Sequence, residues 1–128
     1  MQIHFLIECD DFEDYFLIHK KVLKELNDWL ENTNQNENVT LVDVRVPSVE
    51  TIDDYDPFNP PTWNIGLSIQ TKNVKALKVP VNYLNTLSKK VKVDFSVNKV
   101  TNGQAKTVSY FGFNEKNGDI FEMWQFLS

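Results

Sequence analysis

Hydrophobic residues follow two different periods in the first third of the chain. Residues 2–8 form a short apolar run, which predicts a strand. After it, apolar side chains recur every three or four residues as far as Asn32, which is the period of an amphipathic helix. Either Asp10 or Asp11 can cap the first turn of that helix with its carboxylate. The pattern therefore predicts a strand followed by a long helix.

Two alternating segments come next, with a loop between them. In residues 39–46, valines alternate with Asp43 and Arg45, which predicts a strand with one apolar and one polar face. Residues 47–62 hold four prolines and four acids and are predicted to form a long loop. Residues 63–70 alternate strictly, so we expect a second strand with one buried face.

The second half of the chain predicts one more helix and three strands. Pro80 suits the first turn of a helix over residues 80–90, while residues 73–79 fit either a helical turn or an extended piece. The Asn-Gly pairs at 102–103 and 117–118 are typical of hairpin turns. They join three predicted strands into a meander, at residues 91–100, 105–113 and 119–127.

The predicted order of elements is β-α-β-β-α-β, followed by two further antiparallel strands. The first six elements match the ferredoxin-like arrangement, in which two helices cover one face of an antiparallel sheet. We therefore expect an α+β fold in which a ferredoxin-like sheet is extended by a C-terminal β-meander. The chain has the length of one domain, and neither a repeat nor a linker divides residues 1–128.

The composition excludes several classes of protein. Hydrophobic residues make up 41% of the chain and charged residues 24%, which is typical of a globular rather than a disordered chain. No apolar stretch approaches the roughly 18–20 residues that cross a bilayer, and the first residues lack the basic start of a secretory signal. Cys9 is the single cysteine, so an internal disulfide is excluded. We expect a cytoplasmic protein without a membrane partner, and the many Asn and Lys residues favour a bacterial source.

The chain carries no motif of catalysis or of cofactor binding. Its four glycines do not build a phosphate-binding loop, and no Gly-x-Ser-x-Gly sequence is present. His4 and His19 lie on the first predicted strand and helix, where a pair is geometrically conceivable, and Cys9 is near in sequence. An enzyme of unknown reaction would depend on these three residues. Ligands of the right types for zinc are lacking, so we predict no metal site. Since motifs of catalysis and of cofactor binding are also missing, we predict no cofactor and no enzymatic activity.

Acidic residues concentrate in two clusters. The first surrounds the start of the first predicted helix, where carboxylates suit the helix dipole or a solvated surface. The second lies beside aromatic side chains in the long predicted loop, a composition that suits steering by charge and anchoring by rings. We predict that a partner binds mainly to the second cluster and that the first adds steering charge. The residues are Asp53, Asp54, Tyr55, Asp56 and Phe58, with Asp10, Asp11 and Asp14 as the secondary set.

Charge is distributed unevenly along the chain. Residues 1–71 hold 14 acids and 4 bases, a net charge of −10, whereas residues 72–128 hold 4 acids and 9 bases, a net charge of +5. The lysines of the second part could form a basic face for nucleic acid. However, the aromatic signature of an RNA-binding sheet is missing, and the acidic part would repel phosphate. We therefore predict a basic protein partner and no nucleic acid.

Basic nuclease toxins are neutralised by small, acidic, cytosolic inhibitors that associate fast through charge steering. In this general profile, rather than in any particular motif, the chain resembles bacterial immunity proteins. The resemblance implies a non-enzymatic binder that neutralises a toxin by masking its active site, in contact-dependent growth inhibition or a similar system. The alternative is a homodimeric ligand-binding or regulatory domain of ferredoxin-like type.

The last two predicted strands carry aromatic residues on both faces. Apolar residues on both faces of a strand mean that both faces are covered, or that one of them is an interface. Packing in the core is the simpler interpretation, and a homodimer through these C-terminal strands is the other.

Overall fold

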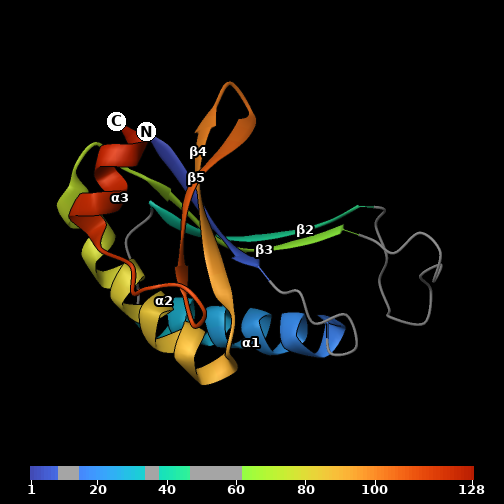
Figure 1. The fold of residues 1–128 in the computed structure, drawn as a ribbon. Helices are drawn as coiled ribbons and strands as arrows, with labels where there is room; N and C mark the ends of the chain where they lie inside the picture. The colour runs from blue at the N-terminus through green and yellow to red at the C-terminus, as the bar shows by residue number, and fades with distance from the viewer. Residues whose placement is uncertain (9–14, 34–37, 47–61) are drawn as a thin grey trace.

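The computed structural model describes residues 1–8, 15–33, 38–46 and 62–128. Figure 1 shows their elements, which are β1 (Gln2–Glu8), α1 (Tyr15–Thr33), β2 (Val39–Val46), β3 (Thr62–Gln70), the 3-10 helix η2 (Val74–Leu77), α2 (Lys78–Val91), β4 (Asp94–Thr101), β5 (Gln104–Gly112) and α3 (Ile120–Leu127). The described residues thus form an α+β fold, as predicted. Among them, no helix has the length and apolar character needed to cross a bilayer.

The five described strands form one antiparallel sheet in the order β2-β3-β1-β4-β5. The first strand of the chain lies in the middle, because β1 pairs with β3 on one side and with β4 on the other. One row across the sheet fixes the register: Ile3 lies opposite Ile69 of β3 and Lys99 of β4. A bulge between Val97 and Asn98 shifts the pairing of β4 with β5.

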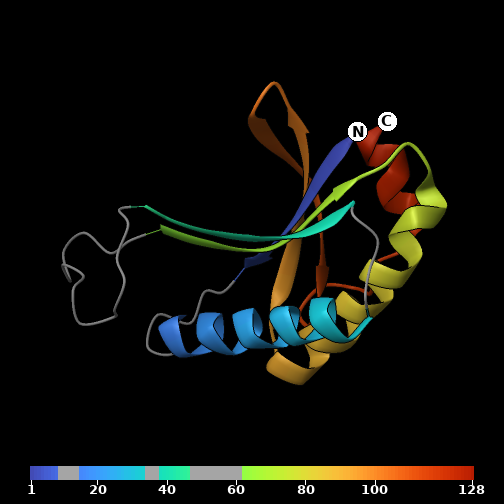
Figure 2. The ribbon, with the colours of Figure 1, turned by 180° about the vertical axis from the view of Figure 1, so that it is seen from behind.

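The helices pack on one face of this sheet and enclose the core. Figures 1 and 2 show α1 and α2 side by side beneath the strands, and the rings of Trp29 and Tyr83 stack between them at 4.6 Å. Burial and the nearby acids Glu25 and Asp28 raise the pKa of Tyr83 to about 12, so its hydroxyl stays protonated and donates to the Glu25 carbonyl at 3.0 Å. These contacts hold α1 and α2 together over the covered face of the sheet.

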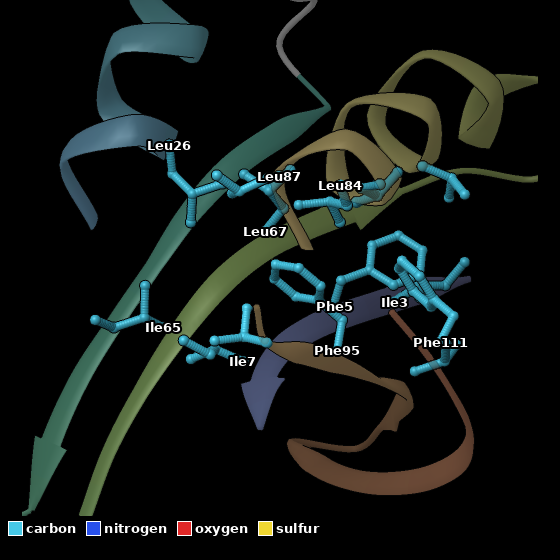
Figure 3. Close-up of a cluster of buried hydrophobic side chains, with 14 of the residues drawn as sticks. Ile3, Phe5, Ile7, Leu26, Ile65, Leu67, Leu84, Leu87, Phe95 and Phe111 are labelled. Carbon is cyan, nitrogen blue, oxygen red and sulfur yellow. The ribbon is translucent and has the colours of Figure 1, made fainter. Parts of the chain in front are cut away.

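Apolar side chains from every layer meet in this core. Phe111 of β5 contacts Phe5 edge-on, with ring centroids 5.8 Å apart, and stacks on Phe95 at 5.7 Å. Figure 3 shows Leu84 of α2 near these rings, and Leu26 of α1 farther along the same cluster; both leucines are fully buried. The hydrophobic alternation in residues 63–70 is confirmed, because every second side chain of β3 from Trp63 to Ile69 is buried here.

The last predicted strand is wrong, since residues 120–127 form the helix α3. Asp119 caps it, because its carboxylate accepts hydrogen bonds from the backbone N–H groups of Phe121 and Glu122. The buried or packed side chains of α3 are spaced by three and four residues, which is a helical period. They are Ile120, Met123, Trp124 and Leu127. The predicted C-terminal β-meander is thereby reduced to the single hairpin of β4 and β5.

The β4–β5 hairpin confirms the predicted turn at 102–103, where Asn102 and Gly103 have φ values of 52° and 78°. The second Asn-Gly pair leads instead into α3, where Gly118 N–H donates to the Asn85 side chain at 2.7 Å. The ambiguous residues 73–79 form η2 and the first turn of α2, which begins at Lys78.

Candidate functional site

All the side chains predicted to bind a partner lie outside the described residues. They are Asp10, Asp11, Asp14, Asp53, Asp54, Tyr55, Asp56 and Phe58. Cys9 also lies outside. The structure does describe the residues that anchor both acidic segments, and these residues define the candidate site.

Both acidic segments are anchored at the same end of the sheet. Residues 47–61 connect Val46 of β2 to Thr62 of β3, which lie opposite each other. Residues 9–14 connect the end of β1 to Tyr15, the first residue of α1. The two anchors touch, because the backbone N–H of Trp63 donates to the Tyr15 hydroxyl at 3.4 Å. Charge carried by either segment is therefore tethered to one end of the molecule.

Four side chains from three elements stack in a column at this end. The Arg45 guanidinium lies 3.9 Å above the Trp63 ring, and Trp63 stacks on His19 with centroids 5.2 Å apart. His19 in turn packs on Tyr15 at 3.9 Å. We call Tyr15, His19, Arg45 and Trp63 the aromatic stack. It joins the start of α1 to the hairpin of β2 and β3, because a cation above an indole face and stacked rings both attract.

A carboxylate completes the polar contacts of the stack. Asp43 accepts a hydrogen bond from the indole Nε1 of Trp63 at 2.7 Å and lies 3.7 Å from the Arg45 guanidinium. Asp43 and Arg45 share the face of β2 that points toward the helices, while Val44 on the opposite face is 49% exposed. The sequence pattern had separated these two faces correctly, but the polar face is the one that packs on Trp63.

His19 has the contacts of a packing residue. It is 2% exposed, and its Nδ1 lies 2.7 Å from the Tyr15 carbonyl, which can only accept. Burial lowers the pKa of His19, partly opposed by its backbone hydrogen bonds to Tyr15 and Trp63. The imidazole is therefore neutral near pH 7, and its polar contacts go to the backbone.

The two histidines lie on opposite faces of the sheet, so the His4–His19 pair that the sequence left open as an alternative does not form. His4 lies on the open face, opposite Ser68 of β3 and Asn98 of β4, and its Nε2 is 3.3 Å from the amide nitrogen of Gln2. Burial lowers the pKa of His4 as well. Neither histidine is within reach of the other, and no group of three metal-binding side chains occurs among the described residues.

The open face carries a buried polar network around His4. The side-chain amide of Asn98 donates to the His4 carbonyl at 3.1 Å and to the Ser96 hydroxyl at 2.8 Å. Thr107 of β5 donates to the same Asn98, and Gln2 donates to Ser68 at 3.2 Å. Because these groups satisfy one another, the network stabilises the strand register rather than presenting unpaired groups to a ligand.

Charge separates more sharply by segment than by half of the chain. Residues 9–14, 34–37 and 47–61 hold nine acids and no base. The described residues hold nine acids and thirteen bases, so their net charge is +4 while that of the remaining segments is −9. A basic frame therefore carries three purely acidic segments.

Sequence reasoning missed the aromatic stack. Trp63 was placed on a buried face and Arg45 on a polar one, but no pattern indicated that Arg45 lies directly opposite Trp63 in the register. The usable signal was an arginine and a tryptophan on strands that border one long loop. Comparison of the chain with protein-family models, with curated proteins and with solved structures returns no match.

Proposed function

We propose that the chain is a non-enzymatic bacterial immunity protein, which neutralises a toxin in the cytoplasm by covering the toxin's active site. The partner is a basic protein domain, and contact-dependent growth inhibition or a similar system is the expected setting. The observation that supports the proposal best is the separation of charge. Nine acids and no base lie in segments of which two are anchored at one end of the sheet.

A concentrated acidic surface accelerates the encounter with a basic partner, because opposite potentials steer the two proteins together. The aromatic stack supports such a role because it holds the ends of the two acidic segments together. It ties Tyr15, where one acidic segment ends, to Trp63, beside which the other ends. A partner that binds there meets anchors already held by stacked rings, so less conformational entropy is lost at the base of the site.

The finer fold assignment is also a proposal. We infer that β1, α1, β2, β3, α2 and β4 have the ferredoxin-like arrangement, with β5 and α3 as additions. The central position of β1 between β3 and β4, and the position of β2 beyond β3, support this inference.

The proposal is tested with the protein encoded next to this chain as the candidate toxin. A triple variant, Asp53→Asn, Asp54→Asn and Asp56→Asn, should slow association at least about tenfold at low salt and change dissociation less. A matched control, Asp28→Asn, Glu31→Gln and Glu115→Gln, removes the same charge from described, exposed positions and should have a smaller effect. Unchanged affinity of the first variant at low salt would rule out the loop as the contact. Failure of co-expression to protect cells from the candidate toxin would count against neutralisation itself.

A further inference from the structure

Two lysines lie side by side at the end of the sheet away from the aromatic stack. Lys99 of β4 and Lys106 of β5 are directly opposite each other in the register. Like charges at directly opposite positions destabilise a sheet. Neither ammonium group forms an ion pair with any residue that the structure describes. The pair is therefore a local electrostatic conflict without compensation in the described fold.

The two lysines line a hollow of about 720 Å³ between the β4–β5 hairpin and α3. Its wall on α3 includes Phe126, which is 54% exposed although the next residue, Leu127, is fully buried. Uncharged hydrogen-bonding side chains form the wall at the hairpin turn: Thr101, Asn102 and Gln104. No acidic side chain lines the hollow. It thus combines two cations, one exposed ring and several neutral polar groups.

Acidic side chains are scarce in the part of the sequence that surrounds this positive charge. Between Thr71 and Phe113 the chain holds eight lysines and one acid, Asp94. That acid lies at the opposite end of β4, where it pairs with Glu8 in the register and accepts hydrogen bonds from Asn114. The row that contains Lys99 also contains Ile69, which is six residues from Trp63 on β3. At 3.3 Å per residue the hollow lies about 20 Å from the aromatic stack along the strand.

A separation of about 20 Å exceeds twice the Debye length at physiological salt, which is about 8 Å. The anchors of segments 9–14 and 47–61, which hold eight of the nine acids, therefore lie outside the range at which their charge would offset that of the lysines. The charged side chains that line the hollow are both positive, although the chain as a whole has a net charge of −5.

We propose that this hollow binds a nucleoside phosphate. The phosphate lies between the ammonium groups of Lys99 and Lys106, which relieves their mutual repulsion and forms charge-assisted hydrogen bonds. The base stacks on Phe126, and the neutral side chains at the hairpin turn face its polar edges. The hollow has the volume of an ordinary small-molecule site, which is roughly 300–1,000 Å³. The inference is independent of the proposed toxin partner, because the two surfaces are at different ends of the sheet.

The first experiment measures binding of ATP by calorimetry and by NMR shifts of the backbone amides. Wild-type protein should bind ATP saturably, with the largest shifts in β4, β5 and α3. The variant Lys99→Gln/Lys106→Gln should bind at least about tenfold more weakly, since each charge-assisted contact contributes more than a neutral one. The matched control, Lys20→Gln/Lys21→Gln, removes the same charge from α1 and should bind within about twofold of wild type. No saturable binding, or equal weakening by both double variants, would overturn the proposal.

The second experiment tests the ring. Phe126→Leu should weaken the binding of ATP but leave that of inorganic tripolyphosphate unchanged, because only ATP has a base to stack. Equal affinities of wild-type protein for ATP and tripolyphosphate would overturn the assignment to a nucleoside. If a single-stranded oligonucleotide bound much more tightly than ATP, with a steep salt dependence, the ligand of the hollow would be nucleic acid and the proposal would be overturned. The melting temperature of Lys99→Gln/Lys106→Gln should be no lower than that of wild type, which would exclude misfolding as the cause of its weaker binding.

Discussion

The two ends of the sheet show opposite relations between charge and packing. At one end, Arg45 lies against the ring of Trp63, and Asp43 accepts the indole N–H at 2.7 Å. At the other end, Lys99 and Lys106 oppose each other beside the exposed ring of Phe126. Each end thus contains cations and an aromatic ring, but only the first brings them into contact with each other.

This difference separates structural from functional use of the same residue types. The contacts of the aromatic stack stabilise the fold and hold the anchors of the acidic segments together. The lysine pair destabilises the hairpin, and a local conflict of this kind is expected where a protein binds something else. Four changes test whether the two ends differ in this way.

The largest effect is expected from Trp63→Ala. Trp63 is 3% exposed, and its ring packs against Arg45 and His19 and donates to Asp43, so its removal leaves a cavity and breaks the hydrogen bond to the carboxylate. We expect a loss of about 3–5 kcal/mol in the free energy of unfolding, measured by urea denaturation. The control Val44→Ala, on the exposed face of β2, should lose far less. A loss below about 1 kcal/mol for Trp63→Ala would mean that the stack does not stabilise this end.

The same end should respond to pH through His19. Its pKa is lowered from about 6.5 in the folded state, so the unfolded state binds more protons between the two pKa values. The stabilisation is therefore fully present above pH 6.5 and is lost as the pH falls through the folded pKa. Denaturation series between about pH 7.5 and pH 5 should show this decline, and His19→Gln should flatten it. Because the pKa of His4 is also lowered, His4→Gln serves as the comparison. Equal slopes for wild type and His19→Gln would contradict the assignment.

In α3, whose last turn lines the lysine hollow, Asp119→Ala should remove the N-terminal cap and lower stability by about 1 kcal/mol. The control Glu115→Ala changes the same charge at an exposed position before the helix. Equal stabilities of the two variants would show that the cap contributes nothing. The loss should leave the aromatic stack intact, so the NMR signals of the Trp63 indole should not shift.

How far this helix could be predicted depends on which local signal is weighed. The Asn-Gly pair at 117–118 and the aromatic residues favoured a strand, but the cap at Asp119 and the spacing of Ile120, Met123 and Leu127 favoured a helix. The helix forms because that spacing places one apolar stripe against the core. A pattern of eight residues contains both periods, and only packing decides between them.

The other elements were predictable because one face of each is apolar. Beyond them, the stack depends on β2–β3 pairing, which places Arg45 opposite Trp63 and directs Val44 outward, opposite Asn64. Alternation along one strand indicates two faces but not which face meets the helices. The lysine hollow depends in the same way on the β4–β5 register. Contacts between strands could therefore not be predicted from the pattern of each segment taken separately.

The smallest expected effect has the opposite sign. Lys99→Gln/Lys106→Gln should raise the free energy of unfolding by about 0.2–1 kcal/mol at low salt, because it removes repulsion between directly opposite charges. The gain should shrink as salt increases, since ions screen exposed charges. As a control, Lys90→Gln removes a lysine that is paired with Glu25 at 2.8 Å and should give no gain. A loss of stability in the double variant would mean that the lysines pack favourably on the hairpin. The contrast between an end that stabilises the fold and an end available to a ligand would then fail.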